Sequence, residues 1–354
     1  MYNQSIITAP VALFLGAGAS KPFGKMLMGE FIDYLEKQDQ FKHANLLRDI
    51  IKVPDGRDLE YLFEELEEWS RKSYHVEDDK TLLRPRGDLA AVGESIVQRL
   101  ARNATTITRA LRREVFCAYR DIPVTSRKRL VKCFDVLFGV LLKGVDAARS
   151  PLVVFTTNYD PAIEAFCQAK GGEFRLCDGF VSQWNAGSPN WHRESFDQFQ
   201  VRATNQKDVV LFKLHGSTSW FNNGENFIKS DAAVYAGDDS SFENILIYPA
   251  RRKIASDDPF FTAYDYFQRT LENCKLCIVI GYSFRDYDAL SRLRSAASYN
   301  PNLRLLVLDP GASVLTERLT AQGVNAGPLG QSFGDKEGEQ VYLRAIRDLV
   351  STIA

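Results

Sequence analysis

The chain has 354 residues, of which 45% are hydrophobic, and this length excludes a small module held together by disulfides. Lys and Arg total 44 against 45 Asp and Glu, so the net charge of -1 offers no bulk attraction to nucleic acid or to an anionic membrane. The longest apolar runs, 11–15 and 136–142, are far shorter than the roughly 18 to 20 residues that cross a bilayer. The sequence predicts a soluble, cytoplasmic protein without direct nucleic-acid or membrane binding, built as two domains or as one α/β domain with a large insertion.

Six short apolar runs recur along the chain, at 11–15, 152–156, 209–214, 245–248, 276–280 and 303–308. Continuous rather than alternating runs are typical of strands covered on both faces. Helical patterns lie between several of them, at 29–38, 161–170, 259–273 and 287–297. This alternation predicts an α/β fold with a doubly wound, mainly parallel, Rossmann-like sheet of six strands. The stretch 178–207 has no clear period and is predicted to be an irregular loop.

The interval between the first and second predicted strands is too long for a single crossover helix. Its periodicity is mostly helical, with an acidic segment at 58–68 and a basic segment at 99–132. We therefore predict a core at 1–24 and 150–354, interrupted by an all-helical insertion at 25–149. The basic segment is interpreted either as a solvated surface that complements the acidic helices or as a binding face for a partner.

The six cysteines are sparse and show no framework spacing, so we expect reduced thiols. Only Cys274 and Cys277 lie close together in the sequence, and a structural zinc would need two further ligands with similar local spacing. Cys167 and Cys177 are too far apart in the sequence to supply them. We therefore expect no bound metal.

The loop after the first predicted strand, Gly16-Ala17-Gly18-Ala19-Ser20, has glycines that let a backbone approach a pyrophosphate at the start of a helix. It lacks the third glycine of the dinucleotide fingerprint, and no acidic residue clearly ends a second strand about twenty residues later, which disfavours a classical dehydrogenase. Gly16, Ala17, Gly18 and Ser20 are candidate cofactor-binding residues. A tight turn without a ligand is the alternative.

Polar side chains follow the second and third predicted strands. Thr157, Asn158 and Asp160 come after the second, at the carboxyl edge where open α/β sheets bind ligands. Asp160 is equally typical of a helix cap, a role that does not account for Asn158. His215, one of only four histidines, ends the third strand and precedes Gly216. It is a candidate acid or base, with a purely structural role as the alternative.

The last two apolar runs also end in small and polar residues. Gly281 and Ser283 could hydrogen-bond a ribose or a phosphate, whereas Asp286 or Asp288 in the same segment could cap the next helix. Asp309 ends the final run, where a carboxylate could meet a ribose or an adenine edge. These loops are all expected on one rim of the sheet.

Four segments taken in order carry a family resemblance: Gly-Ala-Gly-Ala-Ser, Thr-Thr-Asn-Tyr-Asp, Lys-Leu-His-Gly-Ser and Gly-Tyr-Ser-Phe-x-Asp-x-Asp. Together they resemble the sirtuin-like (Sir2-like) NAD-degrading domain of bacterial anti-phage defence proteins. The resemblance implies hydrolysis of NAD+ to nicotinamide and ADP-ribose, which defends the population by depleting NAD in abortive infection. NAD+ would be the substrate, and the reaction would need no metal.

The resemblance also implies roles for individual residues. Asn158 would orient water and ribose hydroxyls, His215 would accept a proton, and Asp160 would hold the nicotinamide carboxamide. The implied NAD-binding positions are Gly16, Ala17, Gly18 and Ser20 on the nicotinamide side, and Gly281, Ser283 and Asp309 on the adenosine half. Thr157 and Gly216, next to the catalytic residues in the sequence, are further candidate NAD-binding positions.

Two departures from sirtuin deacylases bear on the activity. The first loop continues as Gly24-Lys25-Met26 rather than as the sirtuin Gly-x-Pro-Asp-Phe-Arg segment, and the cysteine positions do not supply a four-cysteine zinc module. Both disfavour deacylation. The alternatives to an NAD+ glycohydrolase are therefore a module that senses NAD or ADP-ribose without chemistry, and an NAD-dependent protein deacylase.

Partners are expected from the same resemblance. About forty-five residues follow position 310, with one helix predicted at 340–352, which is too short for a sensor domain. We therefore expect the activating trigger in another chain or in assembly. The resemblance suggests a homo-oligomer and a HerA-like hexameric ATPase as partner, with the helical insertion as the interface.

Overall fold

The computed structural model describes residues 7, 9–35, 37–38, 104–144, 150–182, 188–201, 206–230, 243–247 and 257–353. The acidic segment and most of the predicted helical insertion lie outside these residues. The chain divides into two compact units. The first comprises 1–25, 119–246 and 254–354, and the second comprises 26–118 and 247–253.

The main sheet belongs to the first unit and is parallel throughout. Its seven strands lie in the order β12-β11-β10-β1-β2-β6-β3. Their bounds are Val11–Leu15 (β1), Leu152–Thr156 (β2), Phe174–Cys177 (β3), Lys207–Lys213 (β6), Leu276–Ile280 (β10), Arg304–Leu308 (β11) and Ala326–Leu329 (β12). The predicted doubly wound, mainly parallel fold is confirmed.

The number of strands differs from the predicted six. Five predicted strands are present, whereas the run 245–248 does not join this sheet. The two added strands, β3 and β12, are the edge strands, with four residues each and mostly half-buried side chains. An edge strand of this length has no continuous apolar run, so sequence periodicity does not reveal it.

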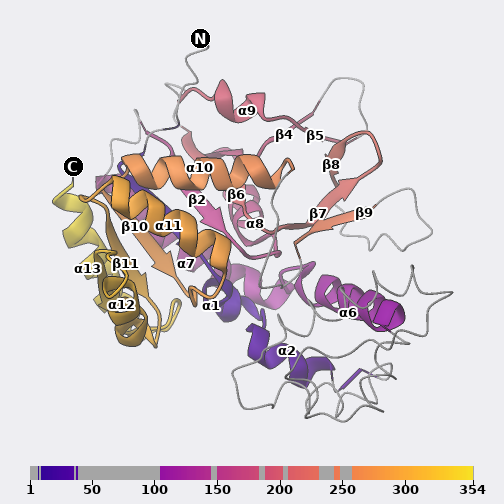
Figure 1. Ribbon diagram of the computed structural model, residues 1–354, viewed down its shortest axis with the longest axis horizontal. Coiled ribbons are helices and arrows are strands. Elements are labelled where there is room, and N and C mark those ends of the chain that lie inside the picture. Colours follow the sequence, from indigo (N-terminus) through magenta and orange to yellow (C-terminus); the bar gives the residue numbers. More distant parts are fainter. Residues whose placement is uncertain are drawn as a thin grey trace, which may run out of the picture. The chain divides into compact units, whose positions relative to one another are not determined.

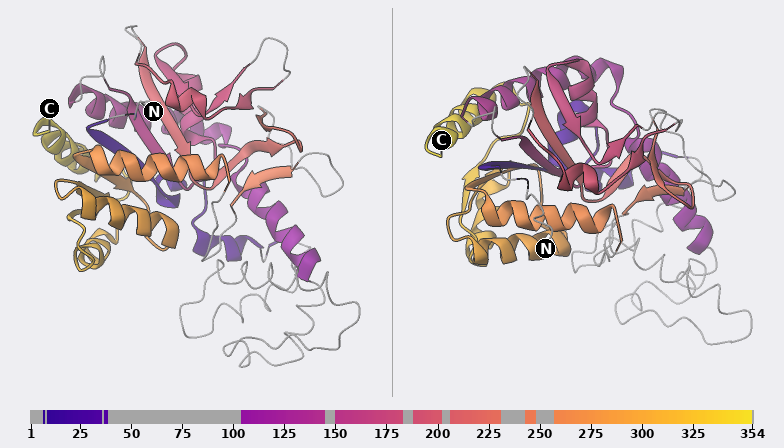
Figure 2. Two further views of the ribbon diagram at one scale, coloured as in Figure 1. Left: turned by 45° about the horizontal axis from the view of Figure 1, so that its top comes forward. Right: turned by 90° about the horizontal axis from the view of Figure 1, so that it is seen from above.

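Successive side chains of the central strands point to opposite faces of the sheet, and each face is covered by its own hydrophobic core. Val11, Leu13 and Leu15 of β1 pack with helices α7 (Val124–Gly144), α8 (Ala162–Ala169) and α13 (Glu339–Ser351). Ala12 and Phe14 pack with α10 (Phe260–Asn273), α11 (Tyr287–Tyr299) and α12 (Ala312–Thr320). Figures 1 and 2 show α10 and α11 side by side over one face of the sheet.

A second sheet is antiparallel, and its strands come from the chain on both sides of β6. Its strands lie in the order β4-β5-β8-β7-β9, with bounds Phe180–Val181 (β4), Asn190–Trp191 (β5), Gly216–Asn222 (β7), Phe227–Lys229 (β8) and Glu243–Leu246 (β9). The stretch 178–207, predicted to be irregular, contributes β4, β5 and the short helix α9 (Glu194–Asp197). The run at 245–248 was wrongly predicted as a parallel strand, because β9 pairs antiparallel with β7.

The helices between β1 and β2 do not all belong to one unit. The boundary expected at 149 differs from the observed division, which places α7 in the first unit. Phe134, Phe138 and Leu141 of α7 are fully buried, and the Phe138 and Phe166 ring centroids lie 5.0 Å apart. An apolar helix face buried in this way belongs to the core of the sheet.

The second unit contains the described helices α2 (Met28–Leu35) and α6 (Ala104–Tyr119). The Tyr34 hydroxyl of α2 donates a hydrogen bond to Glu114 of α6 over 2.9 Å. Burial and the neighbouring carboxylate raise the pKa of Tyr34 to about 12. No helix in the described parts of the chain is both long enough and apolar enough to span a membrane.

Candidate functional site

The loops at the carboxyl ends of the parallel strands form the candidate site, and all of them lie in the first unit. From β1 the chain continues to β2 and β6 on one side and later returns to β10 on the other. Ligands of open α/β sheets bind where the strand order changes direction in this way. The loops after β1 and β10 flank that point, and the loop after β2 lies next to them.

The glycines of the β1 loop allow it to touch the β10 loop. A Cβ atom at Gly16 would lie 2.5 Å from the Gly281 carbonyl oxygen, and one at Gly18 would lie 2.6 Å from the Gly281 Cα. The Gly16 and Gly18 amides donate to the Ile280 and Gly281 carbonyls, each over 2.9 Å. These two predicted phosphate-binding residues therefore have a demonstrated structural role, in which their amides bind protein carbonyls. Ala17 between them is half-buried.

Asn158 connects the β2 loop to the β1 loop. Its Nδ2 donates to the Gly16 carbonyl over 2.9 Å and to the Ser20 Oγ over 3.1 Å. Its backbone amide donates to the Thr156 Oγ1, and the adjacent Thr157 amide donates to the Leu15 carbonyl. Both Nδ2 hydrogens are thus used within the site, which leaves the Oδ1 acceptor of Asn158 for a ligand or a water molecule.

Asp160 is 3% exposed, and its Oδ1 accepts the Ala162 amide at the start of α8 over 3.1 Å. Burial raises the pKa of Asp160, while Lys213, Lys25 and a hydrogen bond from Ser20 oppose this rise. Asp160 therefore both caps the start of α8 and lies at the carboxyl edge of the sheet. Its carboxyl group lies in the protein interior, next to buried cations.

Sequence reasoning missed the buried ion pair beside Asp160. The Lys213 Nζ is 3.2 Å from the Glu164 Oε1 and donates to the Asp160 backbone carbonyl over 2.6 Å. Burial would raise the pKa of Glu164, but Lys213 is close enough that the net shift is downward. The available signal was a lysine within the apolar run 209–214, since buried charges are almost always paired.

His215 lies in the two-residue turn between β6 and β7. Gly216 follows it with φ at 79°, and a Cβ there would lie 2.1 Å from the Ile245 carbonyl oxygen, so only glycine fits this turn. His215 is 6% exposed, and its Nε2 lies 2.6 Å from the Asp286 Oδ2. The structure therefore brings the predicted histidine into contact with a carboxylate of the β10 loop.

Asp286 was considered only as a helix cap in the sequence, and it does cap α11. Its Oδ1 accepts the Asp288 and Ala289 amides over 3.0 and 3.3 Å. Its Oδ2 binds His215 and also accepts the Tyr264 hydroxyl over 3.3 Å. The pairing with His215 joins residues 71 positions apart in the sequence, which no local pattern reveals.

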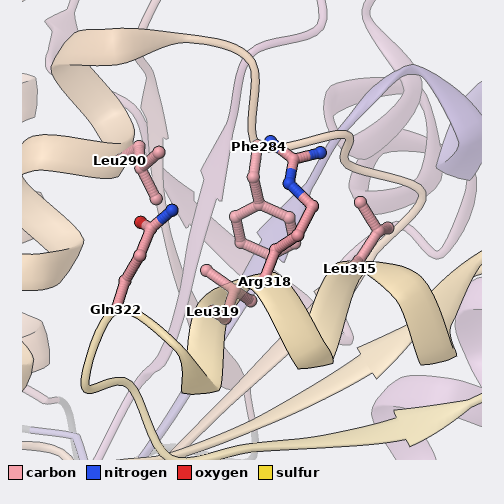
Figure 3. A pocket seen from close by; sticks show the side chains of 6 residues that line it. All are labelled: Phe284, Leu290, Leu315, Arg318, Leu319 and Gln322. Atoms are coloured by element: carbon pink, nitrogen blue, oxygen red, sulfur yellow. The ribbon is translucent and has the colours of Figure 1, made fainter.

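The rest of the β10 loop is anchored by Phe284. This residue is 4% exposed and adopts a φ of 57°, which is rare for a bulky side chain. Figure 3 shows its ring in a pocket with Leu315, Arg318 and Leu319 of α12. Ser283 beside it is exposed, whereas the predicted adenosine-side residue Asp309 is half-buried and accepts the Gly311 amide over 2.8 Å.

The predicted site residues thus fall into three groups. Gly16, Gly18, Ser20, Asn158 and Gly281 are joined by hydrogen bonds and close backbone contacts, with Asp160 tied to Ser20. His215 is joined to the β10 loop by Asp286. Asp309 lies at the end of β11, two strands from β1. Within the described ranges, no three His, Cys, Asp or Glu side chains are grouped so that they could hold a metal ion.

One protein-family model matches part of this chain. Residues 152–327, just under half of the chain, match the model of the SIR2-like domain. A SIR2-like domain implies an NAD-related function. A search of curated protein sequences found no match.

Solved structures of Sir2 homologues are similar at low identity. A Sir2 homologue in complex with NAD is 14% identical with a TM-score of 0.44, over 96% of this chain and 90% of that one. Variants of a Sir2 homologue in complex with ADP-ribose include one 14% identical with a TM-score of 0.41, over 96% of this chain and 93% of that one. Sir2Tm bound to a propionylated peptide is 11% identical with a TM-score of 0.39, over 97% of this chain and 94% of that one.

Proposed function

We propose that this protein hydrolyses the bond between nicotinamide and ribose in NAD+, releasing nicotinamide and ADP-ribose. The observation that carries the proposal is the contact of 2.6 Å between His215 and Asp286 at the carboxyl edge of the sheet. A histidine held by a carboxylate at this edge is typical of a general base. The match of residues 152–327 to the SIR2-like domain supports NAD+ as the substrate.

The reaction breaks the C1′–N bond, and its electron pair returns to the nicotinamide ring, which leaves as a neutral molecule. Positive charge develops on the ribose, and water adds to C1′ while losing a proton. His215 accepts this proton, directly or through a ribose hydroxyl. The Asn158 Oδ1 orients the water and the ribose hydroxyls, and Asp160 binds the nicotinamide carboxamide.

The remaining part of NAD+ is proposed to lie along the loops that surround these residues. The nicotinamide side involves Gly16, Ala17, Gly18 and Ser20, with Thr157 and Gly216 close by. Gly281, Ser283 and Asp309 bind the adenosine half. Because the Gly16 and Gly18 amides donate to protein carbonyls, these two residues shape the site and do not offer their amides to the ligand.

The proposal is tested with the purified full chain and NAD+, with nicotinamide measured by chromatography, in the absence and presence of its partner. Asn158→Ala and His215→Ala are each expected to reduce turnover by at least about 100-fold, because general-base and orienting groups contribute on this scale. His192→Ala is the matched control for removing an imidazole, and it should retain activity. If no nicotinamide forms with or without the partner, the enzymatic proposal fails.

A binding module without chemistry is the second candidate, and the low exposure of His215, 6%, favours it because a buried base is less accessible to water. In that case NAD+ should be recovered intact from the protein after long incubation. Protein deacylation is tested in the same experiment with an acetyl-lysine peptide. Peptide deacylation coupled to loss of NAD+ would favour it over hydrolysis.

The biological setting is also part of the proposal. NAD+ depletion by this enzyme would act in anti-phage defence through abortive infection, since the four ordered segments resemble domains of that kind. We propose a homo-oligomer that is activated through another chain, with a HerA-like hexameric ATPase as the partner. A mass measurement of the protein in solution tests this, because a monomer with full activity would contradict it.

A further inference from the structure

We infer that Asp286 is the positioning residue for His215: it fixes the imidazole in the tautomer that carries its proton on Nε2, so that Nδ1 is the base. This inference rests on the proposed function for its catalytic meaning. The choice of tautomer depends only on the contact between the two side chains, in which the His215 Nε2 and the Asp286 Oδ2 lie 2.6 Å apart.

Charge and geometry determine which nitrogen carries the proton. An ionised carboxylate is only an acceptor, so a neutral imidazole in contact with it must donate from the contacting nitrogen. In His215 that nitrogen is Nε2, and the lone pair is then on Nδ1. The two side chains are 8% and 7% exposed, and water therefore competes little with this hydrogen bond.

The carboxylate of Asp286 is itself held from both sides. Its Oδ1 accepts two amides at the start of α11, where the helix dipole favours a negative charge. Its Oδ2 accepts the hydroxyl of Tyr264, a fully buried residue of α10. The guanidinium of Arg292 lies 5.3 Å from the centre of the Tyr264 ring. A carboxylate fixed by two helices restricts the imidazole to one orientation.

A purely structural role for Asp286 as the cap of α11 makes a different prediction from a positioning role. Asp286→Asn retains an oxygen for the two capping amides, because asparagine caps helices as well as aspartate does. Its amide group, however, donates to Nε2 and favours the opposite tautomer of His215. The variant therefore separates capping from positioning.

The kinetic test compares Asp286→Asn with Asp258→Asn in the full chain. Asp258 is the matched control, because its Oδ1 accepts the Thr262 amide near the start of α10. We expect Asp286→Asn to lower kcat by about 100- to 10,000-fold with little change in KM, as for a base placed in the wrong tautomer. Asp258→Asn should stay within about twofold of the wild type, because asparagine keeps the oxygen that accepts these bonds and Asp258 does not contact His215. Equal kcat values for Asp286→Asn and wild type would overturn the positioning role.

A second measurement does not need activity. The chain has only four histidines, so ¹⁵N-labelled imidazole resonances can be assigned by comparison with His215→Ala. We expect the wild type to show the Nε2–H tautomer of His215 and Asp286→Asn to show the Nδ1–H tautomer. The same tautomer in both proteins would overturn the inference. If the tautomer changes but the wild type does not cleave NAD+, the proposed function fails and the positioning of His215 by Asp286 still holds.

Discussion

Two buried polar clusters lie at the same edge of the parallel sheet and differ in how their charges are balanced. In the cluster of Asp160, Glu164, Lys213 and Lys25, carboxylates and cations face one another. In the cluster of His215, Asp286 and Tyr264, one carboxylate faces an imidazole and a phenol. The first cluster neutralises charge within the core, whereas the second holds an imidazole, which has both a donor and an acceptor nitrogen when neutral. Burial of charge alone therefore does not mark the chemical part of the site.

The largest effect should come from removing the cation of the first cluster. Lys213→Met leaves Glu164 without its partner, and breaking a buried pair from one side typically costs about 3 to 5 kcal/mol. The free energy of unfolding in urea measures this loss. The double variant Lys213→Met/Glu164→Leu should recover most of it. If the free energy of unfolding of the single variant is within about 1 kcal/mol of the wild-type value, the pair does not stabilise the core.

The glycine contact between the β1 and β10 loops should give the next largest effect. In Gly16→Ala the new methyl group would overlap the Gly281 carbonyl, and overpacking of this kind costs about 1 to 3 kcal/mol. Gly139→Ala in α7 is the control, since its added Cβ would meet no atom within 4 Å apart from its chain neighbours and the backbone of its own helix. It should be neutral or stabilising by up to about 1 kcal/mol. A stable Gly16→Ala protein would show that the loops can separate without cost.

The pH dependence of stability distinguishes the carboxyl groups within the first cluster. The pKa of Glu164 in the folded protein is below its ordinary value of 4.5, so its contribution is present above that value and is lost as the pH falls. The raised pKa of Asp160 acts in the opposite sense, because the folded state then binds the proton more tightly. We expect Glu164→Gln to lose less stability than the wild type between about pH 5 and pH 3 in urea titrations. A steeper loss would contradict this assignment.

The smallest effect is expected in the second cluster. Tyr264→Phe removes a hydrogen bond of 3.3 Å to Asp286 and leaves the contact with His215 in place. Such a bond is worth roughly 0.5 to 1.5 kcal/mol, so kcat should fall by about 2- to 10-fold. The NAD+ assay measures this change beside Asp286→Asn. A loss as large as that of Asp286→Asn would mean that Tyr264, rather than the carboxylate alone, orients the imidazole.

The sequence predicted the parts of this edge that local patterns determine. Continuous apolar runs predicted β1, β2, β6, β10 and β11, and with them the loops that lie at the carboxyl edge of the sheet. Helix-capping chemistry correctly suggested Asp160 and Asp286 as caps. All these features depend on neighbours a few residues away, which a single sequence contains.

The features that sequence reasoning missed depend on distant partners. The pairing of His215 with Asp286 and that of Lys213 with Glu164 arise only when segments far apart in the sequence meet. In the second sheet, β4 and β5 were missed because they have two residues each, too few to show alternation. The same limit applies to Gly16, whose loop resembles a phosphate-binding turn but whose Cα lies against the backbone of another loop.

The hydrogen bonds that join the loops after β1, β2 and β10 have a consequence for recognition. Because Asn158 and Gly18 already connect these loops, a ligand need not pay the conformational entropy of ordering them. Binding then depends on how well a molecule fits a shape that exists beforehand, and less on closure around it. Discrimination between related dinucleotides would accordingly appear as steric exclusion, with association rates that change little from one accepted ligand to the next.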